Sequence, residues 1–261
     1  MGKSKITNDQ ILILIEEGKT MKEICSTLKV CKTAIRKRLR KLNINLPNNW
    51  NRSKFNDNIF DVIDTEEKAY WIGFIFADGY ISSSNYTFEI SLSIKDIEHL
   101  NKFNIFMQYE GNNIKVNKTN FEEKYRCRWT ITNKHLWNTL YSYGCVPRKS
   151  LILEFPPITI FKDKSLINHF IRGYWDGDGS VMLNKKDKLV CSVLGTKNFL
   201  SEITKYTEIP RNILGKYDNT YCLIYQGKLA IKLCDYLYNN AKLFLERKYN
   251  RYKFAVLQSN L

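Results

Sequence analysis

The chain has 261 residues, of which 44% are hydrophobic and 13% aromatic, a composition that supports a packed core and excludes an intrinsically disordered protein. Lys and Arg number 41 against 26 Asp and Glu, and the formal net charge of +15 predicts a polyanionic partner, nucleic acid first. The seven cysteines are scattered without C-x-x-C spacing, and no stretch approaches the roughly 20 apolar residues of a membrane span. We therefore expect a reduced, cytoplasmic protein of a bacterial, phage or organellar compartment, with no membrane partner.

Three short helical patterns open the chain, over residues 8–17, 21–28 and 31–42. Only Lys29 and Val30 separate the last two, and apolar positions on all three can converge on a small core, an arrangement that resembles the helix-turn-helix fold. The departure is Lys29, which stands where such turns commonly have Gly. We expect this all-α DNA-binding domain over residues 1–46, followed by a polar, Pro-broken linker over residues 47–60.

The third helix has the composition of a recognition helix. Its polar and basic side chains lie away from the apolar stripe, where they would enter the major groove and reach phosphates. A three-helix bundle with a solvated basic face is the alternative. The DNA-binding candidates of this domain are Lys32, Thr33, Arg36, Lys37 and Arg40.

One nine-residue pattern then occurs twice, as WIGFIFADG at residues 71–79 and as IRGYWDGDG at residues 171–179. Each copy reads as an apolar helix that ends in an acid, Asp78 or Asp178. A carboxylate at a helix C-terminus faces the negative end of the macrodipole, which is unfavourable by roughly 0.3–1 kcal/mol, so its repetition indicates a functional site. We expect the first motif helix to begin with Asp64 as its cap and Glu67 closing the reciprocal hydrogen bond.

Small residues recur four apart on each motif helix, as Gly73 with Ala77 and as Gly173 with Gly177. A Gly inside a helix costs about 1 kcal/mol relative to Ala, so its presence in both copies implies a packing reason. We therefore predict that these four residues form a close interface between two helix backbones.

The segments after each motif follow one order, a hairpin, a helix, two strands and a helix. The first set covers residues 80–82, 86–94, 97–107, 113–116, 126–132 and 134–143, and the second covers residues 180–183, 189–194, 196–206, 213–217, 221–225 and 228–238. The two acids are 178 − 78 = 100 residues apart, which indicates a duplicated domain rather than a solenoid. We place the two repeats at residues 61–155 and 156–261.

These two motifs, with the matching order of elements behind them, resemble the LAGLIDADG homing endonuclease family in its single-chain, two-motif form, over about residues 60–261. The resemblance implies an α+β fold, a duplicated αββαββα unit with pseudo-twofold symmetry. Its motif helices would pack together, with their C-terminal acids meeting at the base of the interface. Two antiparallel sheets would form a basic saddle for DNA, here preceded by the small helix-turn-helix domain.

Carried over by position, the resemblance implies that Asp78 and Asp178 are the catalytic acids and bind metal, with Gly79 and Gly177 beside them. Two adjacent carboxylates repel each other unless a cation lies between them. A hard divalent ion, Mg²⁺ or Mn²⁺, suits oxygen ligands and phosphodiester hydrolysis. Asp176, where the first motif has an aromatic residue, is expected to be a polar interface residue.

The resemblance also implies basic side chains near the scissile phosphates. Lys95, at the end of a strand, matches one such catalytic lysine. The aligned position in the second repeat is Gly195, and the candidate there is Lys197, two residues beyond it. DNA contacts are expected from Lys115, Arg126, Arg128, Lys149, Lys216 and Lys248. The wider pool of strand positions for base readout adds Tyr86, Glu89, Ser91, Ser93, Asn117, Thr130, Ser192 and Tyr221, and a register error of one residue would invert it.

The expected function is that of a site-specific homing endonuclease, a monomer that cuts a long, non-palindromic double-stranded DNA site and spreads its own mobile element by intron homing. Two other functions stay open, a binding-only transcription regulator and an RNA-splicing maturase with intron RNA as its partner. A regulator has no need of both Asp78 and Asp178, whereas a maturase could keep them.

Overall fold

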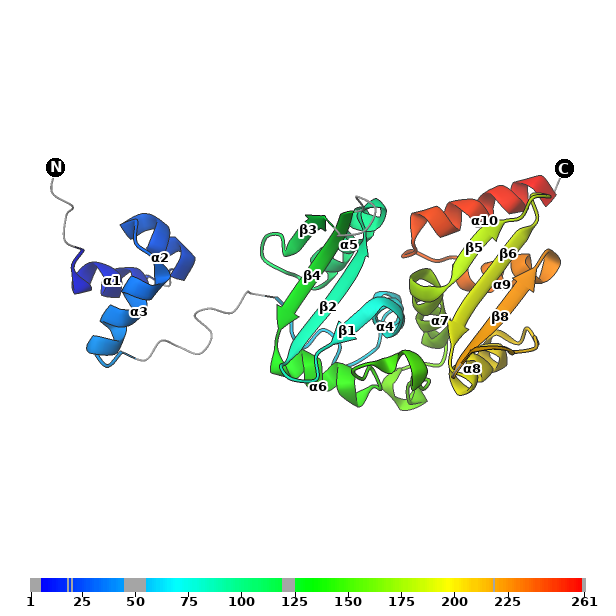
Figure 1. The fold of residues 1–261 in the computed structure, drawn as a ribbon, viewed down its shortest axis with the longest axis horizontal. Coiled ribbons are helices and arrows are strands. Elements are labelled where there is room, and N and C mark those ends of the chain that lie inside the picture. Colours follow the sequence, from blue (N-terminus) through cyan, green and yellow to red (C-terminus); the bar gives the residue numbers. More distant parts are fainter. Residues whose placement is uncertain are drawn as a thin grey trace. The chain divides into compact units, whose positions relative to one another are not determined.

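The computed structural model of the protein describes residues 6–17, 19, 21–44, 55–118, 125–217 and 219–259. The chain divides into two compact units, Met1–Lys54 and Phe55–Leu261, and each is described by itself (Figure 1). Residues 47–54 of the expected linker lie outside the described part.

The first unit contains the helices α1 (Asn8–Glu16), α2 (Met21–Leu28) and α3 (Lys32–Lys41). α1 begins at a reciprocal cap, in which the Gln10 N–H donates to Thr7 Oγ1 (3.2 Å) and the Thr7 N–H donates to Gln10 Oε1 (3.1 Å). Buried side chains from all three helices form a core of Ile11, Met21, Ile24, Ile35 and Leu39. The three helical patterns are thus confirmed, to within a residue or two at each end.

The turn between α2 and α3 shows what Lys29 does in place of Gly. Its φ is +50°, in the left-handed region, and the Val30 N–H donates to the Cys25 carbonyl (3.1 Å) to close the end of α2. The turn therefore has the backbone conformation that favours Gly, and Lys29 adopts it with some strain.

The second unit repeats one order of elements. Its first half consists of α4 (Glu66–Asp78), β1 (Gly79–Ile81), β2 (Thr87–Ser93), a 3₁₀ turn η1 (Ile94–Asp96), α5 (Ile97–Phe106), β3 (Ile114–Lys118), β4 (Tyr125–Thr132) and α6 (Lys134–Ser142). After two further 3₁₀ turns, Lys149–Leu151 and Ile158–Ile160, the second half consists of α7 (Leu166–Asp178), β5 (Ser180–Leu183), β6 (Leu189–Gly195), α8 (Lys197–Thr207), β7 (Leu214–Tyr217), β8 (Thr220–Gln226), α9 (Lys228–Tyr238) and α10 (Glu246–Ser259). The duplicated α+β architecture expected from the sequence is confirmed.

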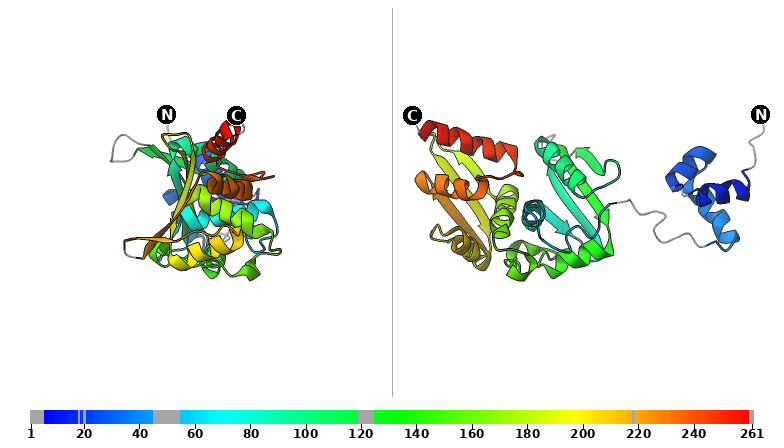
Figure 2. Two further views of the ribbon diagram at one scale, coloured as in Figure 1. Left: turned by 90° about the vertical axis from the view of Figure 1, so that its right-hand side faces the viewer. Right: turned by 180° about the vertical axis from the view of Figure 1, so that it is seen from behind.

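Each half contributes an antiparallel sheet, with strand order β1-β2-β4-β3 in the first and β5-β6-β8-β7 in the second. Side chains alternate between a buried and an open face, as Phe88, Ile90 and Leu92 alternate with polar neighbours on β2. The helices lie on the buried side of both sheets, so the strands form the other side of the unit (Figure 2). A single aromatic-rich core runs through both halves.

The helices α4 and α7 pack backbone to backbone at the centre of this core. A Cβ added to Gly73 would lie 1.9 Å from the carbonyl oxygen of Phe170, and one added to Gly173 would lie 1.9 Å from that of Tyr70. Near the C-terminal ends, a Cβ on Gly177 would lie 2.3 Å from the Cβ of Ala77. The small residues therefore set the distance between the helices, and with it the distance between the acids that end them.

One local expectation needs correction. The cap of α4 is Thr65, whose Oγ1 accepts from the Lys68 N–H (3.3 Å), because Thr65 is the last extended residue before the helix. Asp64 instead forms an ion pair with Lys68 (2.8 Å). The helix α10, which packs on β5 and α9, is additional to the elements expected from the sequence.

No helix among the described residues is both long enough and apolar enough to cross a bilayer.

Candidate active site

The two motif acids are the last residues of the two central helices. Asp78 ends α4 and Asp178 ends α7, and the Cα of Gly177 faces the first acid so closely that a Cβ there would lie 3.4 Å from Asp78 Oδ2. Burial, followed by the charge of Asp178, raises the pKa of Asp78 to about 6. Burial also raises the pKa of Asp178, although its side chain is the more exposed of the two. The structure thus brings together two carboxylates that resist simultaneous ionisation.

A lysine closes the C-terminal end of each of these helices. Lys248, at the start of α10, is 1% exposed, and its Nζ donates to the carbonyls of Trp175 (2.9 Å), Asp176 (2.6 Å), Gly177 (3.3 Å) and Gly179. Lys149 Nζ donates in the same way to the carbonyl of Gly79, just beyond α4. Each ammonium group therefore lies at the negative end of a helix dipole, which offsets the unfavourable placement of the acids.

These lysines are also charged neighbours of the acids, as Arg126 is of Asp78. The charges of both Lys149 and Lys248 lower the pKa of Asp78 and of Asp178, against the larger effect of burial. Burial in turn lowers the pKa of Lys248 to about 8. The expectation that Lys248 is a surface contact to DNA is wrong, because its ammonium group is enclosed by carbonyls.

The structure places Lys95 and Lys197 differently from the expected catalytic lysines. Lys95 is exposed on the 3₁₀ turn after β2, and Lys197 is the exposed first residue of α8. Among the described residues, neither is a source of the pKa changes of Asp78 and Asp178, whereas Lys149 and Lys248 are. The sequence signal for the latter pair was their near-repeat spacing of 248 − 149 = 99 residues, close to the 100 of the acids.

Asp176 lies behind this site as a fully buried polar residue of the helix interface. It accepts hydrogen bonds from Tyr70 Oη (2.9 Å), Tyr238 Oη (2.7 Å) and the Leu245 N–H (2.8 Å). The bond to Leu245 fixes the chain three residues before Lys248. We infer that Asp176 positions this lysine.

The start of α10 also joins the two halves at this end of the unit. Arg247 makes a two-point ion pair with Asp96 (Nε–Oδ1 2.8 Å, Nη2–Oδ2 3.2 Å), and Glu246 pairs with Lys102. Asp96 and Lys102 belong to the first half, whereas α10 belongs to the second. The lysine at the acid pair is therefore held by contacts with both halves.

The donor set suits a hard divalent cation in part. The described residues contain no group of three or more His, Cys, Asp or Glu side chains that could hold a metal ion. Asp78 and Asp178 supply two carboxylates, and the raised pKa of Asp78 indicates that a cation between them would relieve repulsion. The two carboxylates are oxygen ligands of the kind that Mg²⁺ accepts, and water or phosphate would complete the set, because the carbonyls of Gly79 and Gly177 already accept hydrogen bonds from Lys149 and Lys248.

The open face of the first sheet carries the expected DNA-binding residues. Register pairs Arg128 with Ser91 and Lys115, so all three share one face with Arg126, two residues away on β4. Arg128 forms an ion pair with Glu89 (3.1 Å), and Arg126 donates to Ser91 Oγ (3.1 Å). Of the wider pool, Ser93, Asn117 and Thr130 also lie on this face, whereas Tyr86 precedes β2 and packs on Trp137.

On the second sheet the pool fits less well. Ser192 faces the open side, but Tyr221 pairs with Gly195 on the opposite face and packs against the core, so it is wrong as a readout residue. Lys216 lies in β7, and its side chain is outside the described part. In the first unit, the five candidates on α3, Lys32, Thr33, Arg36, Lys37 and Arg40, are all exposed.

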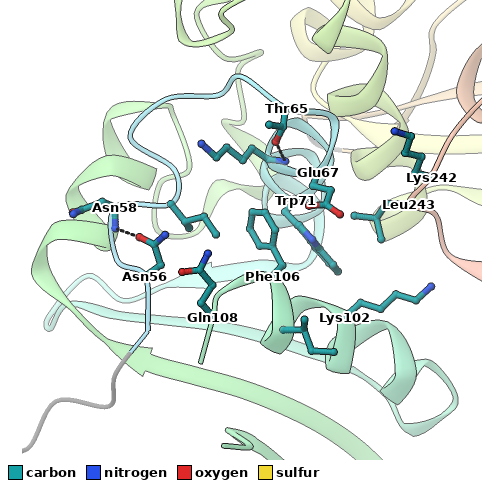
Figure 3. Close-up of a pocket in the computed structure, with 13 residues that line it drawn as sticks. Asn56, Asn58, Thr65, Glu67, Trp71, Lys102, Phe106, Gln108, Lys242 and Leu243 are labelled. Atoms are coloured by element: carbon teal, nitrogen blue, oxygen red, sulfur yellow. Dashed lines mark hydrogen bonds between the residues drawn. The ribbon is translucent and has the colours of Figure 1, made fainter. Parts of the chain in front are cut away.

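A cleft of about 790 Å³ lies elsewhere on the second unit (Figure 3). Trp71 and Phe106 lie among its apolar lining, and Glu67, Lys102 and Lys242 supply charged groups. The cleft lies at the start of α4, where Glu67 is about 16 Å along the helix axis from Asp78 at the other end. It is not the site of the acid pair.

The chain was compared with family models, with curated proteins and with solved structures. No family model matches the chain. An uncharacterised protein of Methanocaldococcus jannaschii is 24% identical over 198 residues, which are 74% of this chain and 62% of that protein, so the chain spans less than two thirds of this relative.

Solved structures similar to this chain are LAGLIDADG homing endonucleases. They include I-LtrWI bound to target DNA (TM-score 0.47, 12% identity, 75% of this chain and 91% of that chain). I-GzeII in complex with its DNA target has a TM-score of 0.46 and 14% identity, over 74% of this chain and 89% of that chain. I-SmaMI bound to uncleavable DNA has a TM-score of 0.49 and 12% identity, over 75% of this chain and 92% of that chain. At such identities the roles of individual residues rest on the geometry of this chain itself.

Proposed function

We propose that the protein is a site-specific DNA endonuclease that hydrolyses phosphodiester bonds at the Asp78–Asp178 pair. One observation carries the proposal: two acids from symmetry-related helices meet, and the pKa of Asp78 is raised by burial and by the charge of Asp178. A protein that only binds DNA gains nothing from this repulsion. Perturbed carboxylates of this kind are typical of functional sites.

Each residue of the site has a physical role in this proposal. A Mg²⁺ ion held by the two carboxylates would activate water and neutralise the leaving oxygen. Lys149 and Lys248 carry two positive charges against the two negative charges of the acids, so a phosphate can approach without net repulsion. Lys248 also keeps the last carbonyls of α7 paired, which holds Asp178 in place.

The symmetry of the fold supports cleavage of both DNA strands. Each half supplies one acid, one lysine and one sheet whose first strand starts directly after the acid, β1 after Asp78 and β5 after Gly179. A duplex lying on both open sheet faces would pass over the acid pair, with one half of the site under each sheet. One chain could therefore act as a monomer on a long, non-palindromic site.

The first unit would add contacts to DNA outside this region. The exposed cations of α3 would bind phosphates or bases, and replacing Arg36, Lys37 and Arg40 by Ala should remove up to three phosphate contacts. The slope of log K against log salt should then become shallower by up to about 2.7. An unchanged slope would show that this unit does not touch the DNA.

The test of the main proposal is a cleavage selection. The protein is incubated with a randomised duplex library in Mg²⁺, beside a Ca²⁺ control, and the cut ends are sequenced. Recurrent cuts at one long site in Mg²⁺, lost in Asp178→Asn and kept in the matched control Asp187→Asn in the exposed β5–β6 turn, would support the endonuclease. Asp178→Asn should retain nearly wild-type affinity for the site. Enrichment of bound but never cut DNA would contradict the proposal and favour a regulator.

A further inference from the structure

The open faces of the two sheets differ in chemistry. In the first sheet, Arg126, Arg128, Lys115 and Glu89 make it charged and rich in hydrogen-bonding groups. These groups are already oriented by one another, because Arg128 and Thr130 both bond Glu89 (3.1 Å each). Such a face suits readout of donor and acceptor groups on base edges.

The corresponding face of the second sheet is largely apolar. Register places Ser192 opposite Ile224 and Ser180, and their neighbours two residues away along the strands share that face. Among these neighbours are Met182, Leu194 and Leu214, which are 50%, 44% and 49% exposed, together with Val190, the buried Cys222 and the exposed Gln226. A contiguous group of exposed apolar side chains on a soluble protein marks an interaction surface.

Cations border this apolar face. The β5–β6 turn presents Lys185, Lys186 and Lys188, all exposed, on a turn ordered by the Asn184 side chain, which accepts from the Lys186 N–H (2.9 Å) and the Lys188 N–H (3.0 Å). The exposed Arg211 donates to the carbonyl of Ile224 (2.7 Å). An apolar floor with a basic border matches a polyanion whose groove contains apolar groups.

Thymine 5-methyl groups in the DNA major groove meet this description. They are apolar, they lie between two rows of phosphates, and apolar side chains contact them in DNA readout. A second copy of this chain would bring a further +15 charge against the same cations, which opposes that occupant. The face is also continuous with the acid pair, because β5 begins two residues after Asp178.

We propose that the second half reads its part of the target through thymine methyl groups, packed against Met182, Leu194 and Ile224, whereas the first half reads hydrogen-bonding groups. The inference rests on the proposed function. It makes the target asymmetric, with a thymine-rich half under the second sheet. It also disfavours RNA, because uracil lacks the methyl group and the A-form major groove is too narrow for side chains to read.

The test replaces thymine by deoxyuridine, which removes only the methyl group. The full chain first selects bound duplexes from a randomised library in Ca²⁺, and dU then replaces dT in one half of the recovered site at a time. We expect affinity to fall about threefold to fourfold for each contacted thymine in one half, from the burial of a methyl group. The same replacement in the other half should leave affinity within about twofold.

Protein variants assign this sensitivity to the second sheet. Leu194→Ser and Ile224→Ser should bind the thymine site more weakly. Each variant should also lose most of the affinity change caused by dU in that half, because the removed side chain and the thymine methyl group are contact partners, as in a double-mutant cycle. The matched control Leu257→Ser, 65% exposed on α10, should keep the wild-type response. Unchanged melting temperatures would show that each variant is folded.

Three results would overturn the inference. Equal responses to dU in both halves, or none in either, would exclude a methyl-reading sheet while leaving the endonuclease intact. A dU response that persists in Leu194→Ser and Ile224→Ser would place the readout elsewhere. A wild-type dimer in sedimentation that Leu194→Ser dissociates would show that a second copy covers the face. Failure of the proposed function itself would appear separately, as a recovered duplex that is bound in Ca²⁺ but never cut in Mg²⁺.

Discussion

Asp78→Asn should make the metal-free protein more stable at neutral pH, even though it removes a proposed catalytic acid. In the wild-type protein Asp78 must ionise while half-buried and next to Asp178, and its pKa is raised from 3.8 to about 6. The folded protein therefore binds more protons than the unfolded chain between these values, so stability falls as pH rises from about 4 to about 6. Asn has nearly the same shape and carries no charge, so the variant avoids this loss.

The magnitude follows from the pKa difference. A difference of about 2 in pKa corresponds to about 3 kcal/mol above pH 7, and we expect about half of this because the side chain is partly accessible to solvent. For a domain of this size, about 1.5 kcal/mol raises the melting temperature by about 3–6 °C. At pH 4 most of the gain should vanish, because Asp78 is then largely protonated in the folded protein.

The assay is thermal unfolding in EDTA at pH 4 and pH 7.5, followed by tryptophan fluorescence. Trp71, Trp129 and Trp175 are buried in the second unit and report on its unfolding. The matched control is Asp64→Asn, since the hydrogen bond from Lys68 lowers the pKa of Asp64 and predicts no gain. Mg²⁺ should then raise the melting temperature of the wild type more than that of Asp78→Asn.

One result would refute this reasoning. If Asp78→Asn melts at or below the wild-type temperature in EDTA at pH 7.5, then Lys149 and Lys248 already compensate the charge of the acids. The site would then have no electrostatic need of a metal ion.

Three further predictions concern the frame of the site and the first unit. Gly73→Ala should destabilise the second unit by about 3 kcal/mol or more in urea unfolding, because its Cβ would lie 1.9 Å from a backbone oxygen. The control Gly215→Ala, whose Cβ would have no neighbour closer than 3.9 Å, should have little effect. Equal effects of the two substitutions would refute the helix contact. Lys248→Met should lower the free energy of unfolding by about 2–4 kcal/mol and abolish cleavage, because several buried carbonyls lose their partner. Lys149→Met should lower it by less, because fewer carbonyls are left unpaired. The reverse order of the two effects would contradict the structure. Lys29→Gly should stabilise the first unit by about 1 kcal/mol, since the φ of Lys29 is +50°. Amide hydrogen exchange in α2 and α3 should then become slower, and an unchanged exchange rate would contradict this turn geometry.

The elements that the sequence predicted well are those specified by local pattern. Alternation of apolar residues located β2 and β6. The small residues four apart, Gly73 with Ala77 and Gly173 with Gly177, predicted a helix contact so close that a Cβ added to either Gly73 or Gly173 would lie 1.9 Å from a facing carbonyl oxygen. The acids at 78 and 178 were found because they repeat and because they end helices. Such signals depend on neighbouring residues only, so they can be read from the chain itself.

The tertiary structure decided which distant residues meet the acids. Lys149 and Lys248 lie 71 and 70 residues after Asp78 and Asp178. Lys149 reaches the end of α4 from the 3₁₀ turn Lys149–Leu151, and Lys248 reaches the end of α7 from α10, which packs against β5. The family resemblance implied Lys95 and Lys197 from their places next to strands, whereas a local pattern does not show that a distant chain segment closes a helix end. Burial changed the role of Lys248 from a DNA contact to a buried cap, since a charge in the core must be paired and its partners come from another element.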